Sequence, residues 1–364
     1  MHHLKFSEFY ITNVCNLNCP ECNRYNNFAF GGHQRWHEYA DSYKEWSKIL
    51  DIEMIGILGG EPMLNPDFID WVKGIAELWP NSLIRISTNG TQLDRHPELY
   101  DVLVQSEGRI HLEISQHGTT LKESIDQNIR SFLRGELSTS IKTNWQWRRR
   151  WREQWEKIAG PDWPYIDDPE LFDTLPQWVQ DEYLVFCPDF DPRTFKKIHG
   201  DGFKPVNVFK KDFFTVQDSN GVILTNQLVD VFSYSAVVFD PETEKLTLHN
   251  SDPVDAMSVC TFPICHQFIR GKLHKCGPTG LLPEFIKQFP VDVSDQDRKL
   301  INSYQAAEYS WPTDKMKTFL DGLRNKDPIP NCKFCPSSLT FKQINSGYKK
   351  IKIAKLDNSN TIAT

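Results

Sequence analysis

Cys15-Asn-Leu-Asn-Cys19-Pro-Glu-Cys22 is the stretch from which the fold is best inferred, because its three cysteines have the spacing C-x3-C-x2-C. It directly follows Phe6–Thr12, an apolar segment typical of a strand. A cubic [4Fe–4S] cluster normally takes four cysteine ligands, so three close thiolates would hold three irons and leave the fourth iron open. An open iron on a redox cluster is a place where a substrate can be ligated and receive an electron.

Strand and helix patterns alternate on both sides of this loop. We expect strands at Phe6–Thr12, Met54–Leu58, Leu83–Ser87 and Ile110–Ser115. Between them we expect helices at Asp41–Leu50, after an N-cap at Asp67, and at Pro97–Ser106. Repeated β-α units predict a parallel sheet with right-handed crossovers, either a barrel or an open doubly wound sheet.

Two glycine-containing turns fall where ligands gather in such folds. Gly59-Gly60-Glu61-Pro62 follows the second expected strand, and Thr88-Asn89-Gly90 follows the third. Because the carboxyl ends of parallel strands meet at one edge, the cysteine loop and both turns are predicted to lie together.

The rest of the chain gives weaker patterns. We expect a helix at Leu121–Leu133, strands at Val222–Leu228, Ala236–Phe239 and Thr243–His249, and a lysine-rich, then polar tail. A Trp/Arg-rich stretch at 145–158 has helical spacing, which fits a packed amphipathic insertion or a clamp for an anionic or aromatic substrate. The expected domains are residues 1–254 with an insertion at about 135–235, residues 255–345, and a tail at 346–364.

Composition narrows the class of protein. The chain has 364 residues, 39% of them hydrophobic, and a net charge of −7, which is enough for a large core and unusual for a dedicated nucleic-acid binder. No apolar stretch approaches the roughly 20 residues that span a bilayer, and no signal peptide is evident. We therefore expect a cytoplasmic protein, in which nine cysteines indicate metal ligands or reactive thiols rather than disulfides.

The order of the three motifs at strand ends resembles the radical S-adenosylmethionine (radical SAM) superfamily over roughly the first 120 residues. The resemblance implies a partial (β/α)6 TIM-like barrel, in which Cys15, Cys19 and Cys22 ligate the [4Fe–4S] cluster and SAM binds its open iron. It also implies that Gly59, Gly60, Glu61 and Pro62 meet the methionine ammonium, and that Ser87, Asn89 and Ser115 contact the ribose and carboxylate. Glu21 departs from the family, which often has an aromatic residue there. A structural zinc knuckle at Cys19-x2-Cys22 is the alternative for this motif.

A second cysteine group follows at the carboxyl-terminal side. Cys260-x10-Gly271-x4-Cys276, with the distal Cys332-x2-Cys335, resembles the truncated SPASM ("twitch") domain, which implies one auxiliary [4Fe–4S] cluster. Cys265 lies near enough in the sequence to compete with Cys260 as a ligand. A fully ligated cluster would carry electrons, and an open one would bind substrate. A zinc site or a purely structural cluster remains open as an alternative.

Four further side chains are candidates for chemistry. Cys187 is a candidate hydrogen-atom donor, although a buried hydrophobic cysteine is the common alternative. His117, after the fourth strand, is a candidate acid or base. His199 and His249 lie in loop-like runs that fit substrate contact or turn chemistry equally well.

These observations predict a radical SAM enzyme that abstracts a hydrogen atom from a small polar substrate, such as a sugar, nucleotide or amino-acid derivative, giving oxidation or rearrangement. The expected electron donor is a flavodoxin or ferredoxin. One rival is a maturase acting on a peptide, against which we note that only 14 residues precede Cys15, without room for a leader-binding domain. The other is an iron–sulfur electron carrier or redox sensor, against which the two glycine-containing turns argue.

Overall fold

The structure is a computed structural model of the chain. It describes residues 1–19, 22–117, 119–134, 137–139, 213–229, 231–232, 236–260, 264–338, 342–343, 351 and 353–356. The stretch at 145–158, Cys187, His199 and Glu21 lie outside these ranges, so the expectations for them stay predictions.

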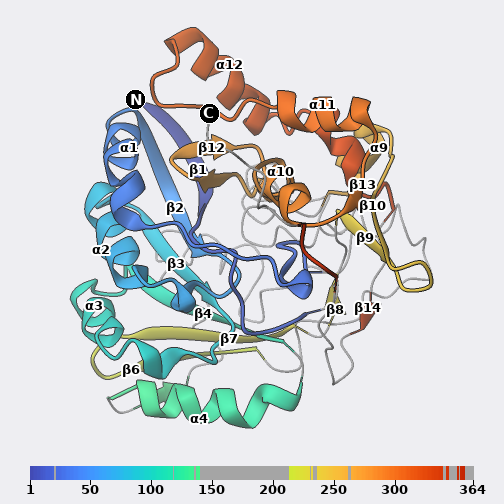
Figure 1. Cartoon of the computed structure of the whole chain (residues 1–364). Helices are drawn as coiled ribbons and strands as arrows, with labels where there is room; N and C mark the ends of the chain where they lie inside the picture. The colour runs from blue at the N-terminus through green and yellow to red at the C-terminus, as the bar shows by residue number, and fades with distance from the viewer. Residues whose placement is uncertain are drawn as a thin grey trace, which may run out of the picture.

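Strands and helices alternate through the first 132 residues, as the sequence predicts (Figure 1). The elements are β1 (His2–Tyr10), η1 (Asn26–Phe28), α1 (Trp36–Ile49), β2 (Leu50–Leu58), η2 (Pro62–Leu64), α2 (Phe68–Leu78), β3 (Leu83–Thr88), η3 (Leu93–Arg95), α3 (Leu99–Gln105), β4 (Ile110–His117), η4 (Thr119–Leu121) and α4 (Lys122–Phe132). Each predicted strand is confirmed, with ends shifted by a few residues.

The later described elements are β5 (Leu137–Thr139), β6 (Phe213–Asp218), β7 (Ile223–Val229), β8 (Val231–Phe232), β9 (Val237–Asp240), β10 (Lys245–Leu248), α9 (Pro253–Ser258), β11 (Gln267–Ile269), β12 (Lys272–His274), α10 (Gly277–Gln288), β13 (Val291–Asp292), α11 (Asp295–Ser303), α12 (Thr313–Arg324), η7 (Pro330–Phe334) and β14 (Lys342–Gln343). The three strands expected between 222 and 249 correspond to β7, β9 and β10.

One sheet organises the described part of the chain. Its order is β12-β11-β1-β2-β3-β4-β7-β6-β5, and the strands from β11 through β7 in this order are parallel. The outer strands β12, β6 and β5 pair antiparallel to their neighbours. The mixed α/β fold with a parallel sheet therefore fits the predicted core, and β12 and β5 stand at the two ends of this strand order.

One face of the sheet carries the main hydrophobic core. Helices α1 to α4 cover this face (Figure 1). Their side chains pack against strand residues such as Phe9, Ile57 and Ile86. Asp67 occupies the N-cap position of α2 as predicted, but its side chain makes no cap hydrogen bond to that helix. It accepts instead from the Trp36 N–H at 3.0 Å and so tethers the start of α1.

The opposite face changes from apolar to charged along the strands. Phe6, Met54, Ile223 and Cys265 form a small apolar cluster. Glu8 lies two residues after Phe6 in β1 and therefore points to the same face of the sheet. Arg85 of β3 lies on this face as well. Arg85 approaches Glu8 at 3.9 Å and Glu113 of β4 at 2.9 Å. The face of the sheet away from the helices is thus polar near the carboxyl ends of its strands.

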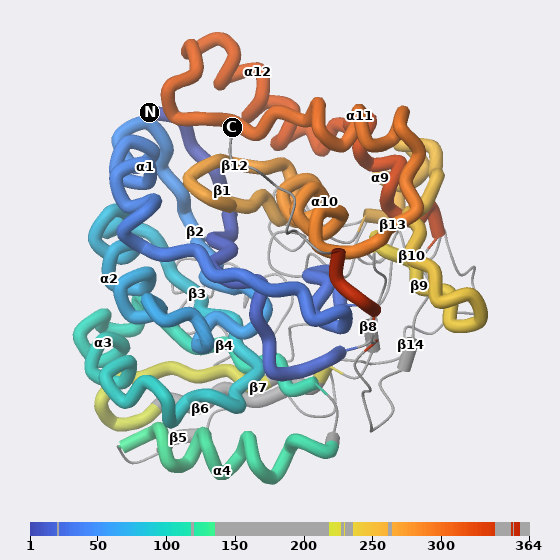
Figure 2. The backbone as a smooth tube through the Cα atoms, in the orientation of Figure 1, coloured from blue at the N-terminus to red at the C-terminus, as the bar shows by residue number. Residues whose placement is uncertain are grey.

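The carboxyl-terminal elements pack against the loop that follows β1 (Figure 2). The ring of Tyr25 lies 4.8 Å from that of Phe285 in α10, and Phe28 and Phe30 contact the same ring at 5.4 and 5.6 Å. This aromatic cluster fixes the cysteine loop of the first motif beside the segment that carries the second cysteine group.

Candidate functional site

The three cysteines of the first motif lie on the loop after β1. Cys19 is buried, and Cys15 and Cys22 are half-buried. Burial raises the pKa of the Cys15 thiol to about 12, and a bond from the Leu17 N–H works against that rise. Burial also raises the pKa of Cys19, with Cys22 and Cys15 adding to the effect. Both thiols are therefore neutral near pH 7 on their own, and a bound cation would release their protons.

Hydrogen-bond donors face two of these sulfurs. The Leu17 N–H donates to Cys15 Sγ at 3.4 Å, and the Asn89 side-chain amide donates to the same sulfur at 3.9 Å. The Asn26 side-chain amide donates to Cys22 Sγ at 3.8 Å. A deprotonated sulfur only accepts hydrogen bonds, so this donor set suits thiolate ligands of a metal cluster.

The Gly59–Pro62 turn lies directly against the residues that precede Cys15. The Gly60 N–H donates to Thr12 O at 2.7 Å, and the Glu61 N–H donates to Val14 O at 2.8 Å. A methyl group on Gly59 would lie 2.6 Å from Thr12 O, and one on Gly60 would lie 2.4 Å from Val14 O. Both glycines are therefore required for the contact between the two motifs, because any side chain would push the loops apart.

Glu61 joins this turn to the third motif. Its carboxylate is fully buried and accepts from the Thr88 hydroxyl at 2.7 Å, the Asn89 N–H at 2.7 Å and the Met63 N–H at 3.1 Å. Burial raises the pKa of Glu61 to about 7, and these three bonds oppose the rise. The carboxylate thus acts here as a structural bridge between the ends of β2 and β3.

Asn89 completes the connection. Its side-chain amide donates to Asn16 Oδ1 at 2.9 Å, and Asn16 in turn donates to the Thr91 hydroxyl at 2.7 Å. Gly90 adopts φ +75°, a left-handed conformation that glycine adopts without strain. The three motifs are therefore one hydrogen-bonded unit around Cys15, as their places at strand ends predicted.

The remaining predicted residues of this region lie near the same ends of the strands. Ser87 of β3 and Ser115 of β4 are half-buried, on the strand face that carries Arg85 and Glu113. His117 ends β4, and burial lowers its pKa to about 4, so the imidazole is neutral near pH 7. His249, just after β10, is half-buried.

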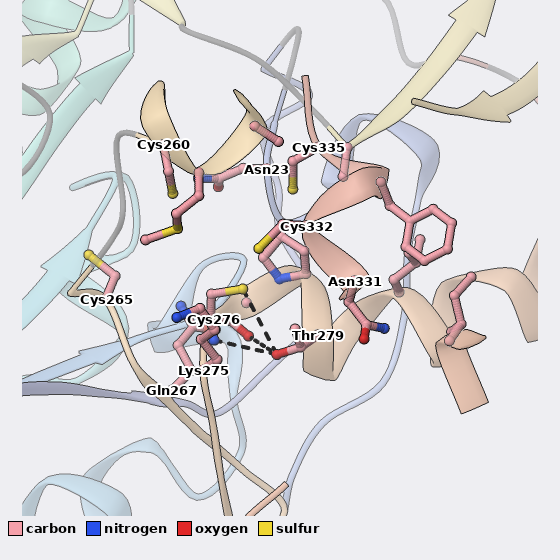
Figure 3. Close-up of a pocket in the computed structure, with 18 of the residues that line it drawn as sticks. Asn23, Cys260, Cys265, Gln267, Lys275, Cys276, Thr279, Asn331, Cys332 and Cys335 are labelled. Carbon is pink, nitrogen blue, oxygen red and sulfur yellow. Dashed lines mark hydrogen bonds between the residues drawn. The ribbon is translucent and has the colours of Figure 1, made fainter. Parts of the chain in front are cut away.

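The second cysteine group surrounds a cavity, in which Cys260, Cys276, Cys332 and Cys335 lie around one centre (Figure 3). Cys260 follows α9, Cys276 is the N-cap residue of α10, and Cys332 and Cys335 belong to η7 and its C-cap. Burial raises the pKa of Cys335, and the three other thiols raise it further. The cavity of about 50 Å³ exceeds the roughly 10–15 Å³ that one buried water needs.

Cys265 also lines this cavity, at one side of the group that the four other cysteines form (Figure 3). Its side chain packs with Phe6, Met54 and Ile223 in the apolar cluster on the sheet face. In the part of the chain that the structure describes, no three Cys, His, Asp or Glu side chains converge as ligands of a single metal ion. A cluster needs less convergence than a zinc ion, because each cysteine binds a different iron.

The residues just after Cys22 connect the two cysteine groups. Asn23 and Arg24 line the second cavity, and Arg24 pairs with buried Glu8 at 3.1 Å. Gln267 of β11 also donates to Glu8, at 2.6 Å. A methyl group on Gly277, next to Cys276, would lie 2.2 Å from Arg24 Nη1. Arg24 therefore packs between the first motif and the start of α10.

The sequence patterns assign no separate role to four residues of this region: Asn16 and Thr88 lie inside the quoted motifs, and Arg24 and Asn26 follow Cys22 closely. No helix in the described ranges combines the length and apolarity needed to cross a bilayer.

A search of the curated proteins gives no match to the chain. The scan against protein families does give one, and it covers the segment in which the three motifs are joined. Residues 9–132 match the family model of the radical SAM superfamily, which identifies this part of the chain as a radical SAM domain.

Proposed function

We propose that the chain is a radical SAM enzyme that cleaves SAM reductively and removes a hydrogen atom from a small polar substrate. The radical SAM domain at residues 9–132 supports the general chemistry, and it implies a [4Fe–4S] cluster, SAM, a reductant and a substrate. The observation that carries the proposal is the hydrogen-bonded unit of Cys15, Glu61 and Asn89, which joins the three motifs.

Cys15, Cys19 and Cys22 would hold the cluster, and the Gly59–Pro62 turn with Asn89, Ser87 and Ser115 would hold SAM. When bound, the two groups supply a 5′-deoxyadenosyl radical, which takes a hydrogen atom from an unactivated carbon. The chain contributes N–H donors to the cysteine sulfurs, a half-buried cysteine loop with Cys19 buried, and a hydrogen-bonded frame around the strand ends.

The charged face of the sheet supports a polar substrate. Arg85 lies between Glu8 and Glu113 just below the strand ends, and its side chain is only 15% exposed. Charged side chains such as these bind hydroxyl, amine or carboxylate groups of a ligand better than an apolar surface does. We therefore favour a sugar, nucleotide or amino-acid derivative, undergoing oxidation or rearrangement with an electron from a flavodoxin or ferredoxin.

We also propose an auxiliary [4Fe–4S] cluster held by Cys260, Cys276, Cys332 and Cys335, with Cys265 left as a packing residue. Four cysteine ligands would leave no open iron, so this cluster would carry electrons rather than bind substrate. In this proposal residues 1–254 form the core and 255–345 the cluster domain, with β11 and β12 of the latter joined to the core sheet.

The test is formation of 5′-deoxyadenosine. The protein is purified without oxygen, reconstituted with iron and sulfide, reduced with dithionite and given SAM. We expect 5′-deoxyadenosine from the wild type and none from Cys15→Ala. An electron carrier or redox sensor would give none from the wild type either, which would overturn the proposal.

Iron counting tests the second centre. We expect Cys276→Ala to bind about four fewer irons per chain than the wild type, and Cys265→Ala, the matched control, to bind as many as the wild type. Zinc in place of iron in the purified protein, or a loss of iron in Cys265→Ala equal to that in Cys276→Ala, would contradict the assignment.

A further inference from the structure

The side-chain amide of Asn26 makes a hydrogen bond through its nitrogen, whereas its oxygen makes none with the described residues. Asn26 is the first residue of η1, it is 4% exposed, and its amide nitrogen donates to Cys22 Sγ at 3.8 Å. Its amide oxygen is buried and has no hydrogen-bond partner among the described residues. A buried amide oxygen without a donor is unfavourable, so the protein retains it most readily if a ligand supplies the donor.

The unbonded oxygen faces the Gly59–Pro62 turn. A methyl group built on Gly60 would lie 2.9 Å from Asn26 Oδ1, so the oxygen lies directly beside this residue. The neighbouring acceptor on the turn, the Glu61 carboxylate, already accepts three bonds from the protein. Asn26 Oδ1 is thus an acceptor at this turn that still needs a donor.

We propose that Asn26 bonds the cluster and its ligand at the same time: its nitrogen donates to the Cys22 sulfur, and its oxygen accepts from the methionine ammonium of SAM. This inference rests on the proposed function, because it needs SAM to bind beside Gly60. A cationic donor suits the site, since charge-assisted hydrogen bonds are about twice as strong as neutral ones. Asn26 is a positioning residue for both groups.

A consequence concerns the reduction potential of the cluster. An N–H donor to a ligand sulfur stabilises the more negative, reduced state, so it raises the potential. An ammonium on the oxygen polarises the amide and strengthens its N–H as a donor. SAM binding and cluster reduction would therefore favour each other through this one side chain.

The experiment compares four anaerobically reconstituted proteins: wild type, Asn26→Ala, Asn26→Asp and Asn27→Ala. Asn27 is the matched control, because it is the next residue of the same turn, is 5% exposed, and also has an amide oxygen without a partner in the described residues. Two quantities are measured: the dissociation constant of SAM by equilibrium dialysis, and the potential of the SAM-sensitive cluster by EPR-monitored titration without SAM.

We expect Asn26→Ala to weaken SAM binding by about ten- to a hundredfold, the effect of a lost charge-assisted bond. Its cluster potential should shift to a more negative value. Asn26→Asp retains an acceptor but no donor, so it should bind SAM at least as tightly as the wild type while its potential becomes more negative. Asn27→Ala should match the wild type in both quantities.

Unchanged SAM affinity in an Asn26→Ala protein with full iron content would overturn the inference, and so would equal losses in Asn26→Ala and Asn27→Ala. If Asn26→Ala does not retain iron, the isosteric Asn26→Asp decides: an unchanged potential there refutes the bond to Cys22. A wild type that binds no iron–sulfur cluster would instead overturn the proposed function, and with it this inference.

Discussion

The buried ion pair between Arg24 and Glu8 gives the sharpest stability prediction. The two side chains are 13% and 6% exposed, and their charged atoms lie 3.1 Å apart. Arg24→Met keeps most of the apolar stem but leaves the Glu8 carboxylate with less compensation. Because Arg24 also packs beside Gly277, this change tests the contact between the two cysteine groups.

The magnitude follows from what remains around Glu8. Removing one partner of a buried pair costs about 3–5 kcal/mol. Here Arg85 stays at 3.9 Å and Gln267 still donates at 2.6 Å, so part of the compensation is retained. We therefore expect a loss near the lower limit, about 3 kcal/mol. The double variant Glu8→Gln/Arg24→Met removes both charges and should recover at least about 1 kcal/mol of that loss.

The assay is urea unfolding of the iron-free protein under reducing, anaerobic conditions, followed by circular dichroism and tryptophan fluorescence. With a slope of about 3 kcal/mol per molar urea, the midpoint should fall by about 1 M in Arg24→Met. Lys272→Met is the control, because the Lys272–Glu308 pair is about half exposed and should matter little. An unchanged midpoint in Arg24→Met, or a double variant no more stable than Arg24→Met, would refute the argument.

Three further changes test other parts of the site. Gly60→Ala should destabilise the protein by about 1–3 kcal/mol and lower the iron content after reconstitution, because the new methyl would lie 2.4 Å from Val14 O. Iron and sulfide assays measure the cluster content, and full iron content in the variant would contradict the prediction. Gly271→Ala should cost about 1–2 kcal/mol, since φ is +73° in the β11–β12 turn, and an unchanged melting temperature would be the opposing result. Asp67→Asn should destabilise the protein at pH 7, because the bond from Arg35 holds the pKa of Asp67 below its usual value. The stabilisation by the ionised Asp67 is present above the pKa of the unfolded state and is lost as the pH falls through the pKa of the folded state. The urea midpoints at pH 7 and pH 3 should therefore differ less for the variant than for the wild type.

Much of the candidate site could be predicted from the sequence, because each of its motifs is a short run of neighbouring residues. The motif order placed the cysteine loop and both turns at strand ends, since the apolar period changes between strands and helices and each motif follows a strand. The structure confirms those strands and joins Cys15, Glu61 and Asn89 within hydrogen-bonding distance. Gly271 was noticed only for its spacing from Cys276, and the structure gives its physical role as a left-handed residue of a tight turn.

The sequence by itself was enough to predict the class of chemistry, because ligand type and spacing lie within a few residues of chain. Only the tertiary structure decided which side chains from distant segments meet. Cys265 lies near enough to Cys260 in the sequence to compete with it as a ligand, yet Cys265 packs against Phe6 while Cys260 faces the other thiols. Glu8 and Gln267 are 259 residues apart and still share a hydrogen bond. Such contacts depend on the path of the whole chain, which no local pattern encodes.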